Sequence, residues 1–478
     1  MKELRSSIRL LTGMMAALVL IVCAAFVLTI QVNGNRWINR ANNTRLADAK
    51  KTTVQGKIMD ESGVVLSESR TAGEREYIED EGTRRALSHV IGDQENMSAT
   101  GVENFHASTL LGFTTTKTGY LLQKLSGQAP VGNDITLTVN AELTKYISDV
   151  FPAWKNGAVV VINYKTGAIL AMLSLPDFDP ANMDQPVQDS AYYNRVLQMR
   201  YAPGSVFKMI TLASALENVP GVKTEEFSCS GLWNYSSGVS NTSSYTLRCA
   251  GGTVHGDMSL AQAFADSCNV TFGALAYRIG ANKLKATADN FAFNYDFAFD
   301  DVILNESKCL SGNRQATDVI QAGIGQGTTQ VTPLHMAMIS GAIANKGIMM
   351  EPKLIKKVTH PNGSVVSEMT SEVFRTVTSE ENAIEIARYM YETVRGGTGT
   401  QAAISGYTAG KICGKTGSAE WTNDKERATH AWYTGFIYGD DAHPYAIAVV
   451  VEEGGYGGSV AAPVASKVLK KAIQMNLY

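Results

Sequence analysis

The chain has 478 residues, enough for two or three domains, and a formal net charge of −3 from 42 Lys and Arg against 45 Asp and Glu. Charged and aromatic residues stand at 18% and 8%, which is ordinary for a globular protein. The basic residues are scattered rather than clustered, so the sequence excludes a nucleic-acid-binding surface of the usual basic kind.

The N-terminus carries an uncharged, largely apolar run over residues 10–30, which is long enough to cross a bilayer as a helix. Lys2, Arg5 and Arg9 precede this run. The positive-inside rule then predicts a cytoplasmic tail over residues 1–9, a retained anchor over 10–31 and an extracytoplasmic remainder. A cleaved signal peptide is the alternative, but the apolar run continues past the small residues that a cleavage site would use. We therefore expect a single-pass protein of the cell membrane.

Residues 32–151 are polar, with mixed charges, and none of their motifs has catalytic spacing. Short strands are expected at residues 64–66 and 135–139, followed by a helix over 141–151. We interpret this segment as an extracytoplasmic pedestal that lifts a larger domain, residues 152–478, away from the membrane.

The composition changes at Gly157, where the second domain begins with two continuous apolar strands that predict a buried antiparallel hairpin. The pattern of the last residues, from about 411 to the C-terminus, predicts an antiparallel strand meander followed by a helix. Further strands are expected at 353–368 (a hairpin), 411–420, 430–438 and 444–452, and helices at 192–199, from 205, at 260–265, after Thr332, at 380–396 and at 460–475. The pattern predicts an α/β (α+β) domain in which helices cover an antiparallel sheet.

The first candidate site is Ser205-Val-Phe-Lys208, at the start of a helix that is apolar nearly all the way round. Residues three apart share a helical face, so the Ser205 hydroxyl and the Lys208 amine can meet. Burial near the positive end of the helix should lower the pKa of Lys208, which would make it a base for Ser205 as nucleophile. The alternative is a serine at a helix start with a solvated lysine.

Two later stretches are weak signals alone. Ser267 and Asn269 follow a short buried helix and can project into one cleft, or can make only local backbone bonds. Lys415-Thr-Gly417 lies in an alternating strand whose glycines leave an edge where an extended peptide can pair, with Lys415 and Thr416 placed to hold a carboxylate. A strand-turn glycine beside a solvated lysine is the alternative there.

Six cysteines occur: Cys23 in the apolar run and five in the second domain. Cys229 and Cys249 flank a polar loop and could form a disulfide in an oxidising compartment. No Cys-x-x-Cys or His-x-x-x-His spacing exists and the seven histidines are dispersed, so the sequence predicts no metal site and no cofactor.

The three stretches occur in the order Ser-x-x-Lys, Ser-x-Asn, Lys-Thr-Gly, which is the signature of penicillin-binding proteins and class A β-lactamases. From Gly157 to the C-terminus the chain resembles the transpeptidase domain of class B penicillin-binding proteins. Further matches are Gly157-Ala-Val-Val-Val, Asn182, Asn194-Arg195, Gly325-Gln-Gly327, Val331-Thr-Pro-Leu334, Lys415-Thr-Gly-Ser-Ala-Glu420, His430-Ala-Trp432 and Gly457-Gly-Ser459. The pedestal match is looser, because two arginines of the family's pattern are missing from Gln55–Gly63.

The resemblance implies a penicillin-binding/β-lactamase-like fold with a central helical nucleophile, and a D,D-transpeptidase that cross-links peptidoglycan stem peptides. It implies that Ser205 attacks the D-Ala-D-Ala donor with Lys208 as base, releasing D-alanine, and that Ser267, Asn269 and Lys415 relay protons and orient the substrate. Thr416, Gly417 and Ser418 would bind substrate, and the backbone N–H groups of Ser205 and Ser418 would form the oxyanion hole. β-Lactams would trap Ser205, and a membrane glycosyltransferase of the SEDS type would be a partner.

Two other functions stay open at this point. One is hydrolysis, as in a D,D-carboxypeptidase or a β-lactamase. The class A hydrolases need a glutamate that activates water, and Glu306, the one Glu between Asn269 and Met350, has no Glu-x-x-x-Asn setting. The other is a non-catalytic membrane protein that only binds β-lactams or cell-wall peptides, although nine cytoplasmic residues leave little room for signalling.

Overall fold

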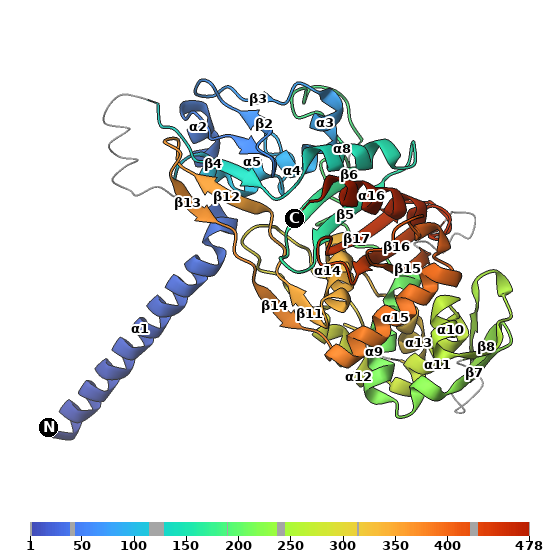
Figure 1. The fold of residues 1–478 in the computed structure, drawn as a ribbon. Coiled ribbons are helices and arrows are strands. Elements are labelled where there is room, and N and C mark those ends of the chain that lie inside the picture. The colour runs from blue at the N-terminus through green and yellow to red at the C-terminus, as the bar shows by residue number, and fades with distance from the viewer. Residues whose placement is uncertain are drawn as a thin grey trace.

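The structure, a computed structural model, describes residues 2–38, 44–113, 129–188, 190–236, 244–312, 315–420 and 429–477. Helix α1 (Lys2–Ile38) projects from the body as a single rod (Figure 1). Its segment Ser7–Thr29 has exposed side chains and is, among the described residues, the one helix long and apolar enough to cross a membrane. This segment overlaps the predicted anchor and fits a single-pass membrane helix.

The N-terminal part contains small helices packed around a six-stranded sheet of order β13-β12-β4-β1-β2-β3. Strands β12 (Ile355–Thr359) and β13 (Val365–Glu368) form the predicted hairpin, and β12 pairs antiparallel with β4 with Val358 opposite Ile135. The hairpin from the second half of the chain thus completes the pedestal sheet. The other elements are α2 (Thr44–Thr52), β1 (Ile58–Met59), β2 (Val65–Glu68), β3 (Glu76–Tyr77), α3 (Glu81–Ala86), α4 (Ser88–Ile91), α5 (Val102–Phe105), α6 (Ala107–Leu110), β4 (Asp134–Leu137) and α8 (Ala141–Val150).

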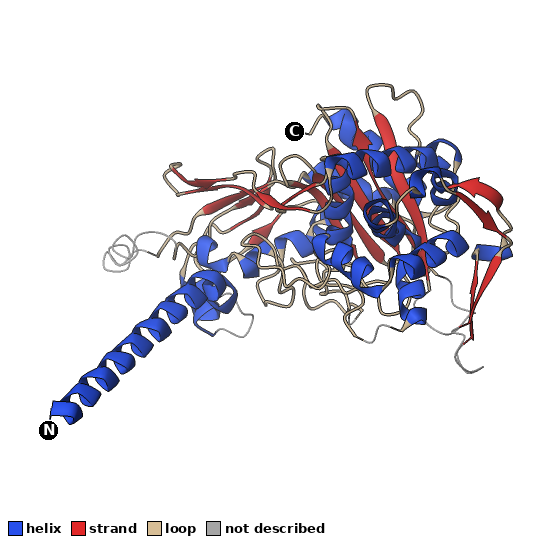
Figure 2. Ribbon diagram, turned by 90° about the horizontal axis from the view of Figure 1, so that it is seen from below, coloured by secondary structure: helices blue, strands red, loops and turns tan. Residues whose placement is uncertain are grey.

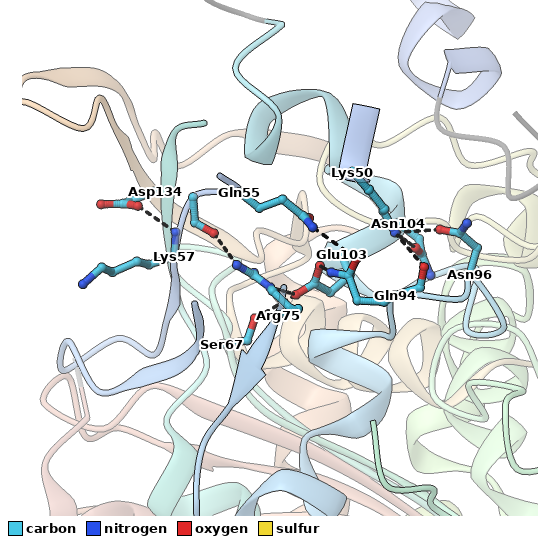
Figure 3. A network of polar contacts seen from close by, with 11 residues as sticks. Lys50, Gln55, Lys57, Ser67, Arg75, Gln94, Asn96, Glu103, Asn104 and Asp134 are labelled. Carbon is cyan, nitrogen blue, oxygen red and sulfur yellow. Dashed lines mark hydrogen bonds and ion pairs between the residues drawn. The ribbon is translucent and has the colours of Figure 1, made fainter. Parts of the chain in front are cut away.

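A buried ion pair holds the pedestal together (Figure 3). Arg75 Nε donates to Glu103 Oε1 at 2.6 Å, and both side chains are almost fully buried. Arg75 Nη1 also donates to the Gly56 carbonyl at 2.8 Å, so this guanidinium fixes the segment in which the family's arginines are missing. Ser67 Oγ donates to the same Glu103 oxygen at 2.7 Å, and Gln94 Nε2 donates to the other at 3.1 Å.

The C-terminal part is built on an antiparallel sheet of order β15-β16-β17-β5-β6, which lies between layers of helices (Figure 2). Its strands are β5 (Gly157–Asn163), β6 (Ile169–Leu175), β15 (Lys411–Ala419), β16 (His430–Tyr438) and β17 (Tyr445–Val451). Both faces of the sheet are buried, since α16 (Ala461–Met475) and α8 pack on one side and the fully buried α14 (Pro333–Ala344) packs on the other. The central strands are therefore continuous apolar runs.

The C-terminal part contains further helical elements, of which α15 packs against α14. They are η1 (Gly204–Phe207), α9 (Lys208–Asn218), η2 (Val222–Thr224), η3 (Ala250–Gly252), α10 (Leu260–Ala265), α11 (Asn269–Ile279), α12 (Ala281–Asn290), α13 (Ala316–Gly323), α15 (Glu380–Gly396) and η4 (Thr400–Ala402). Six short strands in three pairs complete the described C-terminal part. They are β7 (Glu226–Cys229) with β10 (Gly256–Ser259), β8 (Leu232–Ser236) with β9 (Ser244–Arg248), and β11 (Ile348–Met350) with β14 (Val373–Thr376).

The prediction of a helix over residues 192–199 is wrong, because the structure has only turns there. The Asn194 Oδ1 atom accepts the N–H groups of Val196 and Leu197, and Ser174 Oγ accepts that of Arg195. A side chain that satisfies the backbone locally replaces the helical ladder.

Candidate active site

Ser205 lies in the 3₁₀ turn η1, one turn before the α-helix α9. The sequence predicted that the α-helix begins at Ser205, whereas the structure begins it at Lys208. Gly204 has φ of 56°, and its N–H donates to the Gly325 carbonyl at 2.9 Å, which ties the turn to a neighbouring loop. The half-buried Ser205 lines a cavity of about 690 Å³, together with Ser267, Asn269 and Thr416 to Ser418.

Lys208 is fully buried as the first residue of α9. Its Nζ donates to the Ser267 carbonyl at 2.7 Å, to Ser267 Oγ at 3.2 Å and to Asn269 Oδ1 at 2.8 Å. Among the described residues no hydrogen bond joins it to Ser205, so the predicted contact between these two side chains is replaced by contacts to the second motif. Burial lowers the pKa of Lys208 to about 7, so a neutral amine is accessible near neutral pH.

Ser267 lies in the short connection between α10 and α11, and Asn269 is the first residue of α11. Ser267 has φ of 61°, a left-handed conformation that is uncommon for a residue with a side chain and concentrates at functional sites. The Asn269 side chain bridges two groups, because its Oδ1 faces Lys208 while its Nδ2 donates to the Arg248 carbonyl at 3.0 Å. The connection thus aims both side chains at the Lys208 amine.

The Lys-Thr-Gly stretch lies on β15, which is an edge strand as the sequence predicted. Lys415 is fully buried with Nζ donating to the Thr416 carbonyl at 3.1 Å. Burial first, and the charge of Lys208 second, lower the pKa of Lys415 well below its usual value, while Asp266 opposes this. The Thr416 hydroxyl lies 2.6 Å from that of Thr398, a residue that the sequence analysis did not single out because no motif marks it.

Glycines let the nucleophile turn and the edge strand approach each other. A Cβ on Gly417 would lie 2.9 Å from the Pro203 carbonyl oxygen, and a Cβ on Gly204 would lie 2.8 Å from that of Ser418. The backbones around Ser205 and Ser418 are therefore neighbours, as an oxyanion-binding pair of N–H groups requires. Gly457 donates its N–H to Ser418 Oγ at 3.2 Å and fixes that side chain.

The arrangement suits nucleophilic acyl transfer. One cleft is lined by two hydroxyls and an open strand edge that an extended peptide can pair with. A buried amine with a lowered pKa contacts the second hydroxyl from within the core. Among the described residues that line the cavity, Asp266 is the one carboxylate. Glu306, the candidate for water activation, does not line the cavity and lies 3.9 Å from the Lys308 amine.

The Cys229–Cys249 disulfide suggested by the sequence is not formed in the structure. Both thiols are free, with their Sγ atoms 3.6 Å apart, whereas a disulfide needs about 2.05 Å.

The family model for the penicillin-binding protein transpeptidase domain matches residues 157–470. The chain is 31% identical over 406 residues to the peptidoglycan D,D-transpeptidase PbpA of Mycolicibacterium smegmatis, covering 79% of this chain and 80% of that protein. It is 29% identical over 474 residues to the stage V sporulation protein D of Bacillus subtilis, and the match covers 90% of this chain and 70% of that protein.

Solved structures agree with these relatives. Penicillin-binding protein A from M. tuberculosis, as its ceftriaxone acyl-enzyme complex, superposes with a TM-score of 0.79 at 27% identity and covers 90% of this chain and 100% of that one. The D,D-transpeptidase domain of a peptidoglycan glycosyltransferase from Eggerthella lenta superposes with a TM-score of 0.74 at 30% identity. The match covers 89% of this chain and 99% of that one. With the anchor, the ordered motifs and the shared fold, the chain belongs to the class B penicillin-binding proteins.

Proposed function

We propose that this chain is a serine D,D-transpeptidase that cross-links peptidoglycan stem peptides and is inhibited covalently by β-lactams. The observation that carries the proposal is the buried Lys208 amine, which is held by Ser267 and Asn269, two residues that line the cleft together with Ser205 and β15. The relatives that are named peptidoglycan D,D-transpeptidases, and the acyl-enzyme complex of a structural neighbour, support it.

In the first half-reaction neutral Lys208 takes the proton of the Ser205 hydroxyl, and Ser205 Oγ attacks the carbonyl carbon between the two D-alanines of the donor. The backbone N–H groups of Ser205 and Ser418 stabilise the resulting oxyanion, a contribution on the order of 10²–10³ in rate per donor. A proton reaches the leaving amine through Ser267 and Lys415, the C–N bond breaks, and D-alanine leaves a peptidyl ester on Ser205.

Substrate is held by the edge of β15. The donor pairs as an added strand, the Lys415 amine and the Thr416 hydroxyl hold its terminal carboxylate, and Asn269 orients its amide. In the second half-reaction an amine of a neighbouring stem peptide attacks the ester, forms the new amide bond and regenerates the Ser205 hydroxyl.

The N-terminal helix anchors the enzyme to the cell membrane, and we propose that residues 1–9 lie in the cytoplasm, residues 10–31 cross the membrane and residues 32–478 lie outside. Positive charge before the apolar run supports this orientation. In this arrangement residues 32–151, completed by the β12–β13 hairpin, serve as the pedestal of a transpeptidase domain over 152–478. A SEDS-type membrane glycosyltransferase is the proposed partner, a role suggested by the family alone.

One preparation of the full chain in detergent tests the function. The protein is incubated with labelled penicillin, and then with a thioester donor plus a D-amino-acid acceptor. A long-lived ester mapped to Ser205 by mass spectrometry, together with a transfer product, is expected. Rapid turnover to penicilloate would instead establish a hydrolase, and an ester without transfer would establish a binding protein.

A further inference from the structure

Four side chains that the sequence did not connect converge beside the cleft. Cys229 ends β7, Cys249 follows β9, His255 precedes β10 and Cys268 caps α11. Their three sulfur atoms and one imidazole nitrogen all lie within 4.8 Å of one another. We propose that these four residues bind one zinc ion, and that this ion holds the Ser267–Asn269 connection and the adjacent cleft wall in place.

The distances match a tetrahedral site. Ligands at the usual Zn–S distance of about 2.3 Å and Zn–N distance of about 2.0–2.1 Å lie about 3.8 Å apart for two sulfurs and about 3.6 Å apart for sulfur and nitrogen. The structure has 3.6 Å between the sulfurs of Cys229 and Cys249, 3.8 Å between those of Cys249 and Cys268, and 3.5 Å from Cys229 Sγ to His255 Nδ1.

The surroundings favour thiolates rather than a disulfide. The backbone N–H of Gly231 points at Cys229 Sγ at 3.3 Å, and that of Thr271 points at Cys268 Sγ at 3.4 Å. Donors of this kind stabilise metal-bound sulfur and fix its orientation. Cys249 also lies at nearly the same distance from both other sulfurs, so the cluster is arranged around a common centre and not as one close pair.

The ligand set identifies the metal and its role. Three thiolates and one imidazole in tetrahedral arrangement suit Zn²⁺ and do not suit Mg²⁺ or Ca²⁺, which prefer oxygen ligands. Four protein ligands leave no open position for water or substrate, so the ion is structural. The three cysteines are buried, while the half-buried His255 faces the cavity.

The position of Cys268 links the ion to the cleft. It is the middle residue of Ser267-Cys268-Asn269, directly after the left-handed Ser267. The segment from Ala250 to His255 lines the cavity, and Arg248, next to Cys249, accepts the Asn269 side-chain N–H. Metal bonds at Cys249 and Cys268 would therefore lock the two segments between which Asn269 is held.

The site is tested first by metal binding, which does not depend on the proposed function. The full chain in detergent is reduced, stripped with a chelator and titrated with Co²⁺, and the zinc content of the untreated protein is measured by elemental mass spectrometry. One zinc per chain, and one Co²⁺ with thiolate charge-transfer and tetrahedral d–d absorption, displaced by Zn²⁺, are expected. Cys229→Ser should lose both the bound zinc and the Co²⁺ absorption bands. Cys309→Ala, a control at another buried cysteine, should keep both the zinc and the bands.

Failure has a clear form. The absence of these bands in the stripped wild-type chain, an unchanged spectrum in Cys229→Ser, or a mapped Cys229–Cys249 disulfide in protein isolated without reductant would each overturn the site. If Cys229→Ser does not fold, the wild-type titration decides, supported by a rise in unfolding temperature when Zn²⁺ is added to the stripped chain.

The positioning role is tested by acylation with labelled penicillin. The stripped chain, with its fold checked by circular dichroism, should acylate on the order of tenfold or more slowly than the zinc-loaded chain, with restoration by Zn²⁺. Equal rates in the two forms would show that the ion does not position Ser267 and Asn269. Zinc binding with no acylation in either form would contradict the proposed function and leave the metal site standing.

Discussion

Lys208 Nζ lies 2.7 Å from the carbonyl oxygen of Ser267 and 3.2 Å from its hydroxyl, although the motif that contains Lys208 also contains Ser205. With Asn269 Oδ1 the amine has three acceptors, the full number that an ammonium group can serve. Loss of one proton frees one position on the nitrogen. In the proposed mechanism, this freed position is the one that accepts the Ser205 proton.

Replacing Lys208 with methionine removes this acceptor while keeping most of the buried volume. We expect Lys208→Met to lower the acylation rate with labelled penicillin by on the order of 10²–10⁴, the usual contribution of a positioned base. Lys467→Ala, on the exposed side of α16, should acylate like the wild type. Wild-type rates in a folded Lys208→Met chain would remove Lys208 as the base.

The pH dependence of acylation should report the same amine. The pKa of Lys208 is lowered to about 7 by burial, and only the neutral form accepts a proton. The rate of acylation should therefore rise with pH up to about 7 and then level, falling tenfold per unit well below it. Stopped-flow measurements with a chromogenic cephalosporin check this, and a flat profile across the range would contradict it.

Gly325 should tolerate no side chain, for two separable reasons. Its φ of 71° disfavours alanine by roughly 1–2 kcal/mol, and an added Cβ would lie 2.1 Å from the Gly204 carbonyl oxygen, next to Ser205. Gly406 has a similar φ of 78° but open space around it. Thermal unfolding should show a small decrease in the unfolding temperature for Gly406→Ala and a larger decrease for Gly325→Ala. Gly325→Ala should also be acylated more slowly by labelled penicillin. Equal decreases in unfolding temperature and equal acylation rates for the two variants would show that the close approach of Gly325 to Gly204 has no effect.

The pedestal ion pair should be costly to break. Arg75→Ala leaves the fully buried Glu103 carboxylate without its cation, and breaking a buried pair in this way costs about 3–5 kcal/mol. Arg70→Ala, which removes an exposed partner of Glu68 and Glu76, should cost less than about 1 kcal/mol. Denaturant unfolding measures both, and adding Glu103→Gln to Arg75→Ala should recover part of the loss. Comparable losses of unfolding free energy in Arg75→Ala and Arg70→Ala would show that the buried Arg75–Glu103 pair does not stabilise the fold more than an exposed pair does.

The regular elements of the second half could be predicted because local signals agreed with the fold. Alternation and turn residues fixed the meander from β15 to β17, and Thr332 followed by Pro333 fixed the start of α14. The edge position of β15 followed from its glycines. The resemblance carried by the ordered motifs then implied that the three stretches act together, and residues of all three line the cavity around Ser205.

What could not be predicted depends on contacts between distant segments. The hairpin over 353–368 was expected, but not that it joins β4, because pairing partners leave no local mark. The Lys208 contacts depend on where α10 ends, and Thr398 meets Thr416 only through packing. Rules for metal sites rely on short spacings such as Cys-x-x-Cys, so they find nothing in Cys229, Cys249, His255 and Cys268, whose ligand atoms only the fold brings together.

The β12–β13 hairpin comes from the second half of the chain but belongs to the N-terminal sheet, and this has a consequence for how the protein folds during synthesis. β4 ends at Leu137 and its neighbour β12 begins at Ile355, so the first sheet stays unfinished until three quarters of the polypeptide has been synthesised. Closing so long a loop is slow and leaves a bare strand edge open to wrong pairing meanwhile. A shortened protein that starts at residue 152 would keep the β12–β13 hairpin but lose β4, the partner of the other edge of β12, so expression of residues 32–478 should give the more soluble material.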